Sequence, residues 1–93
     1  MKIYAYADPN IEADVYDTGK TIETKLKNIV PDAYMASVFP IDNSNWAISF
    51  YVEEYPNLKK VTNYLRNLPA FKKVTSEECG EDCFYVYCYM WEI

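Results

Sequence analysis

The chain has 93 residues, and its composition is 51% hydrophobic and 25% charged. A chain of this length forms one compact domain rather than two, and this balance of residue types excludes an intrinsically disordered protein. The formal net charge of −5 argues against binding to a nucleic acid, because contacts with a phosphate backbone need an array of lysine and arginine. We therefore expect a single domain over residues 1–93 whose partners carry basic surfaces.

The first residues predict a strand followed by a poorly defined connection. In residues 2–7, small and aliphatic side chains alternate with Tyr4 and Tyr6, which is the pattern of a half-buried strand. Residues 8–10 have the composition of a turn. The pattern of residues 11–16 allows a short strand or a helical turn, and we predict an irregular connection there.

Two segments have the apolar spacing of amphipathic helices. Beyond Gly19, apolar residues follow from Ile22 at i, i+4, i+7 and i+8 until Pro31 ends the pattern. The second segment runs from Pro56 to Leu68, with one apolar stripe and a proline directly after it. We expect a helix in each segment, with the charged side chains opposite each stripe in contact with solvent. The polar face of the second helix, with Lys59, Lys60 and Arg66, is basic, and the alternative is that it contacts an acidic partner.

Four further segments predict β-strands. They cover residues 33–41, 46–53, 71–79 and 83–93. The second alternates most regularly, with a large apolar residue at every even position. The third has apolar residues of mixed parity, which predicts a bulge or a late start. The fourth contains neither glycine nor proline and is rich in aromatic residues, which is typical of a long strand.

The predicted order of elements is β, α, β, β, α, β, β. This is the split βαβ order of ferredoxin-like folds, with one extra C-terminal strand that forms a hairpin with the strand before it. Right-handed crossovers would place both helices on the same side of the sheet. We therefore expect an α+β domain in which two helices pack on one face of an antiparallel sheet.

Aromatic side chains gather on the strand face that such helices would leave open. The chain is 17% aromatic, and side chains of roughly 150–250 Å² each would exceed the patch that a typical monomer exposes, even when half-exposed. The predicted set on this face is Tyr4, Tyr6, Tyr51, Tyr85, Tyr87, Tyr89 and Trp91. We predict that it binds a protein or a second copy of the chain. The alternatives are closure by residues 8–17, rings that pack on one another, and base stacking with a nucleic acid.

Four carboxylates surround the turn before the final strand. They are Glu77, Glu78, Glu81 and Asp82. Such a negative hairpin tip would dock on lysine and arginine of a partner, and the alternative is that it only keeps the turn soluble. Cys79 and Cys83 would lie within disulfide distance across a hairpin. Closing so short a loop would stabilise by only about 2 kcal/mol, and a reducing cytoplasm would oppose the bond, so we predict two free thiols.

The sequence lacks the residue types on which most catalysis depends. With no histidine, a cysteine or serine nucleophile has no customary base, and two glycines do not make a phosphate-binding loop. The oxygen ligands of a calcium loop are missing, and a zinc site would lack two ligands. We therefore predict a protein that is not an enzyme and that binds no metal or cofactor.

The N-terminal residues contain no long apolar segment of a secretory signal. No run approaches the roughly 20 apolar residues of a membrane span. Three cysteines without histidine do not make the disulfide framework of a secreted protein. We therefore expect a cytoplasmic protein with no membrane partner.

These features predict a small acidic domain that acts by protein–protein interaction through its aromatic face, its acidic hairpin, or both. In size and composition it is similar to small phage or mobile-element inhibitors of host machinery, anti-CRISPR proteins among them. This likeness implies that the domain occludes a basic, nucleic-acid-binding surface of its target in the host cytoplasm. The alternatives are a structural homodimer and a binder of small molecules or peptides that uses the aromatic face.

Overall fold

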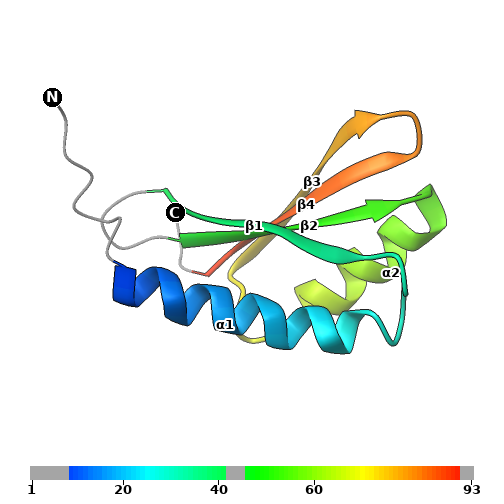
Figure 1. Ribbon diagram of the computed structural model, residues 1–93. Helices are drawn as coiled ribbons and strands as arrows, with labels where there is room; N and C mark the ends of the chain where they lie inside the picture. Colours follow the sequence, from blue (N-terminus) through cyan, green and yellow to red (C-terminus); the bar gives the residue numbers. More distant parts are fainter. Residues whose placement is uncertain (1–8, 42–45, 91–93) are drawn as a thin grey trace, which may run out of the picture.

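The computed structural model describes residues 9–41 and 46–90. In chain order, the elements are α1 (Pro9–Leu26), β1 (Tyr34–Pro40), β2 (Trp46–Glu53), α2 (Tyr55–Arg66), β3 (Lys73–Gly80) and β4 (Cys83–Tyr89). The strands form one antiparallel sheet in the order β1, β2, β4, β3, and both helices lie on the same side of it (Figure 1). The prediction of an α+β fold with two helices and an antiparallel sheet is confirmed. The strand predicted at residues 2–7 lies outside the described residues.

The ferredoxin-like strand order is not confirmed. In that order, the strand before the first helix stands between the two strands that the second helix connects. Here β4 takes that place, because it pairs with β2 on one side and with β3 on the other. The β3–β4 hairpin therefore turns back into the middle of the sheet and leaves β3 at an edge of the sheet that the described strands form.

Helix α1 begins at Pro9, well before Gly19, so the predicted irregular connection over residues 11–16 is wrong. Its buried stripe consists of Val15, Gly19, Ile22 and Leu26. The spacing of four, three and four residues keeps this stripe on one helix face. A side chain at Gly19 would overlap Met35 of β1, so α1 passes close to the sheet at this point. The glycine is therefore a contact residue inside the helix and does not mark its beginning.

The hydrophobic core lies between the two helices and the face of the sheet on which they pack, which we call the covered face. Its largest strand residues are Trp46, Ile48, Phe50 and Val52 from β2 and Phe84, Val86 and Cys88 from β4. Helix α2 contributes its predicted stripe, of which Leu58, Val61 and Leu65 are buried. Helix α1 ends at Leu26, before the predicted boundary, and the next residues return Val30 and Ala33 to the core.

The remaining strand boundaries follow the pattern of the sequence closely. Strand β2 covers the predicted residues 46–53. Strand β3 starts late, at Lys73, and its pairing with β4 shifts register between Glu78 and Gly80. Strand β4 begins at Cys83 as predicted and ends at Tyr89, and residues 91–93 lie outside the described part of the chain.

Candidate functional site

The face opposite the helices, which we call the open face, carries a row of tyrosines that crosses the sheet. The pairing register places Tyr34 of β1 opposite Tyr51 of β2, and Tyr51 opposite Tyr85 of β4. Strand β3 completes the row, because Glu77 lies opposite Tyr85. Side chains directly opposite one another in a sheet lie within contact distance. The row therefore brings three rings and one carboxylate together from all four strands.

Five rings on the open face touch in sequence, and we call them the ring cluster. They are Tyr34, Tyr51, Tyr85, Tyr87 and Phe39. The ring centroids of Tyr34 and Tyr51 lie 5.0 Å apart, and those of Tyr51 and Tyr85 lie 5.7 Å apart. These separations fall in the range of favourable aromatic pairs. The rings remain partly exposed, and Tyr34 is 44% exposed.

Small residues in the middle of the open face let the rings lean over β2. Phe39 of β1 and Tyr87 of β4 lie on opposite sides of β2, yet their ring centroids are only 6.3 Å apart. Beneath them Ala47 is fully buried, at 0% exposure. The hydroxyl of buried Ser49 lies 2.7 Å from that of Ser37. The rings therefore pack on one another, as one of the predicted alternatives required, and still present an outer surface.

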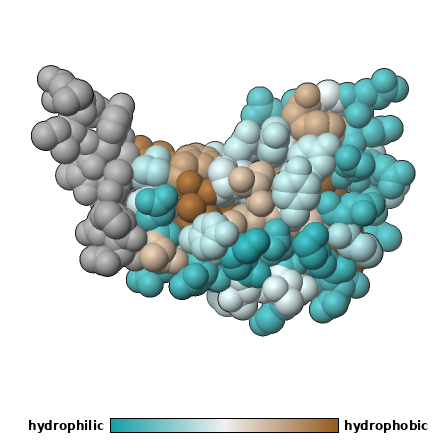
Figure 2. Space-filling view, viewed as in Figure 1, coloured by the Kyte–Doolittle hydropathy of each residue, from teal (hydrophilic) through white to brown (hydrophobic). Residues whose placement is uncertain are grey.

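Figure 2 shows where this surface lies. Brown residues gather toward one end of the strands, and pale to tan residues continue toward the raised β3–β4 hairpin, beside which the surface is hollowed (Figure 2). Hydrophilic residues predominate along the helices on the other side of the sheet (Figure 2). The hollow is the part of the open face that a partner could fill.

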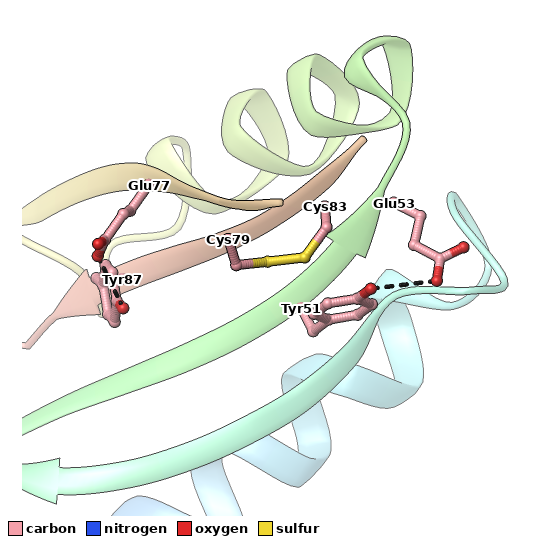
Figure 3. Close-up of a disulfide and its surroundings, with 6 residues drawn as sticks. All are labelled: Tyr51, Glu53, Glu77, Cys79, Cys83 and Tyr87. Carbon is pink, nitrogen blue, oxygen red and sulfur yellow. Dashed lines mark hydrogen bonds between the residues drawn. A yellow bond between two sulfur atoms is a disulfide. The ribbon is translucent and has the colours of Figure 1, made fainter. Parts of the chain in front are cut away.

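Two tyrosine hydroxyls of the ring cluster donate hydrogen bonds to carboxylates. The Tyr51 hydroxyl donates to Glu53 at 3.2 Å, and the Tyr87 hydroxyl donates to Glu77 at 3.1 Å (Figure 3). Partial burial, followed by the hydrogen bond to the carboxylate, raises the pKa of each tyrosine above its ordinary value of 10.0. Each pair therefore keeps a neutral ring beside a negative charge at neutral pH.

The predicted acidic hairpin is divided between the two faces of the sheet. Glu77 lies on the open face, whereas Glu78 has the parity of the covered face. Glu81 and Asp82 form the turn, where Asp82 has a positive φ of 53°. The pleat of β3 thus separates Glu77 from Glu78, and the other two carboxylates lie beyond the strand.

The same end of the sheet gains two carboxylates from the end of β2. Glu53 lies opposite Cys83. The backbone N–H of Glu54 donates to the Asp82 carbonyl at 3.0 Å, and this bond ties the start of α2 to the hairpin turn. The negative region therefore includes the β2–α2 junction as well as the hairpin.

A disulfide joins Cys79 to Cys83, and their Cα atoms are 5.3 Å apart, so the prediction of two free thiols is wrong. The register shift next to Cys79 places an extra residue in β3, which brings the two sulfur atoms together across the hairpin. In Figure 3 the disulfide lies between the two tyrosine–glutamate pairs. Cys88 is free and buried on the covered face, where burial raises the pKa of its thiol.

The structure brings together the described part of the predicted aromatic set. Tyr51, Tyr85 and Tyr87 belong to the ring cluster, and the ring of Tyr89 on the same face lies 5.8 Å from the Lys73 ammonium. The other predicted residues, Tyr4, Tyr6 and Trp91, lie outside the described residues.

Sequence reasoning missed Tyr34, Phe39 and Glu53. Tyr34 and Phe39 are five positions apart, so simple alternation puts them on opposite faces. A register shift between Met35 and Ser37 restores them to one face. Glu53 carried a usable signal, because it lies two positions after Tyr51 on the same strand face.

The described residues contain no group of three or more histidine, cysteine or acidic side chains arranged to hold a metal ion. Within the same part of the chain, no helix is long and apolar enough to cross a membrane. Comparison with protein-family models, with curated proteins and with solved structures finds no match to this chain. The arrangement that its own residues build is therefore the basis for a functional proposal.

Proposed function

We propose that this chain is a non-catalytic protein-binding domain and that the open face is its binding surface. The observation that carries this proposal is the ring cluster, in which five touching rings stay partly exposed on the face opposite both described helices. Aromatic side chains are enriched at the centres of protein interfaces. They bury a large area while few rotatable bonds become fixed.

The charges around the ring cluster favour a basic partner. In the pairs of Tyr51 with Glu53 and of Tyr87 with Glu77, the carboxylate accepts from the hydroxyl at the end of the ring. An arginine of the partner can stack its guanidinium on such a ring and bind the second oxygen of the carboxylate. The net charge of −5 would attract a positively charged surface over a longer range.

In this proposal the domain acts as an inhibitor. A protein surface that binds nucleic acid is rich in arginine and lysine, and the carboxylates of the open face and the hairpin would occupy the places of phosphates. An inhibitor of this kind, encoded by a phage or mobile element and comparable to an anti-CRISPR protein, would work in the host cytoplasm. Because disulfides are rare in that compartment, trapping free thiols in intact cells would show whether the Cys79–Cys83 bond forms there.

Affinity capture from an extract of the host cell tests the binding surface. Tyr85→Ala removes the central ring of the cluster, and Tyr16→Ala removes a tyrosine that is 46% exposed on α1. We expect Tyr85→Ala to reduce recovery of the captured protein about tenfold or more, as for a central interface residue. Tyr16→Ala should leave recovery unchanged.

The charge requirement has its own matched pair of variants. The double variant Glu53→Gln, Glu77→Gln removes both carboxylates of the tyrosine pairs, and Glu12→Gln makes the same chemical change on exposed α1. Capture that weakens only in the double variant, and that weakens with added salt in the unchanged protein, supports a basic partner. Equal capture by all variants would exclude the open face as the binding surface.

Self-association through the open face is the alternative use of the same surface. Two copies would bring together their ring clusters and also their glutamates, and a net charge of −5 on each copy opposes this contact. Light scattering at high protein concentration separates the two cases, because a monomer excludes the homodimer and leaves the proposal of a basic partner intact.

A further inference from the structure

Among the described strands, β3 has one edge whose backbone groups point away from the sheet. In an antiparallel sheet, successive residues direct their N–H and C=O groups alternately to one neighbour and to the other. The bond from the Met90 N–H to the Trp46 carbonyl shows that Tyr89 directs its own groups away from β2 and toward β3. Its partner Lys73 therefore faces β4. By alternation, Val74, Ser76 and Glu78 direct their backbone groups to the outer edge.

The opposite edge of the sheet, on β1, is protected. The outward N–H of Met35 donates to Glu23 of α1 at 2.7 Å. The pairing of β1 shifts register between Met35 and Ser37, and the strand ends at Pro40, which has no N–H to offer. A helix side chain, a bulge and a proline are established means of blocking strand addition. The edge of β3 has a bulge near its end, beyond Glu78, and Arg66 of α2 donates to one of its outward carbonyls, that of Val74.

A groove of about 500 Å³ runs between α2 and the edge of β3. Its lining residues are Tyr55, Leu58, Lys59, Thr62, Asn63 and Arg66 of α2 and Ser76 of β3. Leu58 and Thr62 are buried at its base, whereas Lys59, Asn63 and Arg66 are exposed. Arg66 also donates from Nη2 to the outward Val74 carbonyl at 3.4 Å, so its guanidinium lies at the strand edge. The groove thus combines a strand edge with two positive charges.

We propose that the β3 edge and this groove bind an extended acidic peptide segment of a partner, which adds to the sheet as a fifth strand. The backbone of the segment would pair with Ser76 and Glu78, and alternate side chains would enter the groove. Lys59 and Arg66 select glutamate or aspartate at those positions, because a guanidinium binds a carboxylate through two parallel hydrogen bonds. This site differs in place and in preferred charge from the open face.

A second copy of the chain fits this edge poorly. Pairing β3 with β3 of another copy would fix Glu77 and Glu78 near the same residues of the partner strand, and like charges across a strand pair are destabilising. A peptide can instead place its carboxylates opposite Val74 and Ser76, beside Lys59 and Arg66, and a neutral residue opposite Glu78. The proposal therefore commits to an acidic segment of a different protein.

Amide hydrogen exchange, measured by NMR with a synthetic peptide, tests the site. The probe is a seven-residue threonine peptide in which two alternate positions carry glutamate, so that the glutamates can lie opposite Val74 and Ser76 and a threonine opposite Glu78. At saturating peptide, we expect the exchange rates of the Ser76 and Glu78 amides to fall by about tenfold or more, because strand pairing protects these amides. The outward amide of Val38 on β1 should not change. Unchanged exchange at Ser76 and Glu78 would overturn the proposal.

Peptide variants separate the backbone and charge contributions without altering the protein. In antiparallel pairing, the peptide residues whose side chains enter the groove are also the ones whose N–H groups face β3. The same peptide with N-methylated glutamates therefore cannot pair with β3, and a peptide with lysine in place of glutamate reverses the charge. We expect each change to weaken binding about tenfold or more. Peptide binding that survives both changes would contradict strand addition. Slow exchange of the Ser76 and Glu78 amides without peptide, caused by self-association, would contradict it as well.

Protein variants locate the charge contacts. The double variant Lys59→Gln, Arg66→Gln should weaken binding of the glutamate peptide about tenfold, whereas Lys60→Gln, at an exposed position outside the groove lining, should have no effect. Tyr85→Ala, which tests the proposed function, should leave peptide binding unchanged, so failure of one proposal is distinguishable from failure of the other. An equal loss of peptide affinity in the Lys60→Gln control would mean that the charges act only through long-range attraction. It would exclude the groove as the binding site.

Discussion

The two faces of the sheet are built from neighbouring residues of the same strands, and they differ in what the side chains contact. In β2, Phe50 is fully buried beneath the helices, whereas the next residue, Tyr51, is half-buried among other rings and donates to a carboxylate. Burial of aliphatic and aromatic side chains on the covered face stabilises the fold. The open face uses rings of similar size whose polar ends stay accessible. Stability and the proposed binding thus depend on alternate residues of one strand.

Substitution of the two neighbours in β2 measures this difference most directly. Phe50→Ala leaves a cavity between sheet and helices, and we expect it to lower the free energy of unfolding by about 3–5 kcal/mol. Tyr51→Ala removes ring contacts that are partly exposed, with an expected cost of about 1 kcal/mol. Urea denaturation followed by circular dichroism gives both values. Equal costs would mean that the open face contributes to the core as much as the covered face does.

Reduction of the Cys79–Cys83 disulfide measures how much this bond stabilises the end of the β3–β4 hairpin. That end lies beyond most of the hydrophobic core. We expect a reducing agent to lower the free energy of unfolding by about 2 kcal/mol, because the closed loop is short. The variant Cys79→Ser, Cys83→Ser should show no response to the reducing agent.

The covered face supplies an internal comparison for the same experiment. After reduction, a thiol reagent should label Cys79 and Cys83 in the folded protein, while buried Cys88 reacts only on unfolding. Rapid labelling of Cys88 in the folded state would show that the covered face opens easily.

The close approach of α1 to the covered face gives a smaller effect with a characteristic sign. Gly19→Ala gains about 1 kcal/mol of helix propensity but forces the Met35 side chain to move. We expect a net loss of about 1 kcal/mol in the otherwise unchanged protein. In a Met35→Ala background the same substitution should stabilise, because the obstacle is gone. A double-mutant cycle by urea denaturation measures both signs, and a stabilising Gly19→Ala in the unchanged protein would contradict the close approach.

The elements whose signals are local could be predicted from the sequence. Strand β2 alternates without interruption, and α2 carries a regular apolar stripe followed by a proline. The predicted bounds of both elements therefore agree with the observed ones to within about two residues. The same alternation predicted that Tyr51, Tyr85 and Tyr87 share a face, which the pairing of β2 with β4 then brings into contact.

The features that depend on contacts distant in sequence could not be predicted in this way. Which strand lies beside β2 is decided by packing of the whole sheet, and the pattern of β4 is the same at either position. Gly19 resembled a helix boundary because its role depends on Met35 of β1. The bulge that returns Phe39 to the face of Tyr34, and the one beside the disulfide, are visible only once the strands are paired.

Alkaline titration gives the smallest expected effect on stability, and it reports on the tyrosines of the open face. On the open face, partial burial and the bonds to Glu53 and Glu77 raise the pKa of Tyr51 and Tyr87 above 10.0. A group whose pKa is higher in the folded state contributes stability that is fully present below its unfolded pKa and is lost as the pH rises through the folded value.

We therefore expect stability to fall slightly above pH 10.0, as phenolates form beside carboxylates. Phenolate absorbance of the Tyr51→Phe and Tyr87→Phe variants, compared with the unchanged protein, assigns the two late titrations. The change Glu77→Gln should lower the pKa of Tyr87 toward its ordinary value and leave that of Tyr51 where it was, because each hydroxyl has its own carboxylate. A titration of Tyr87 that does not respond to Glu77→Gln would mean that burial alone sets its pKa. The ring would then carry no oriented negative charge for a basic partner.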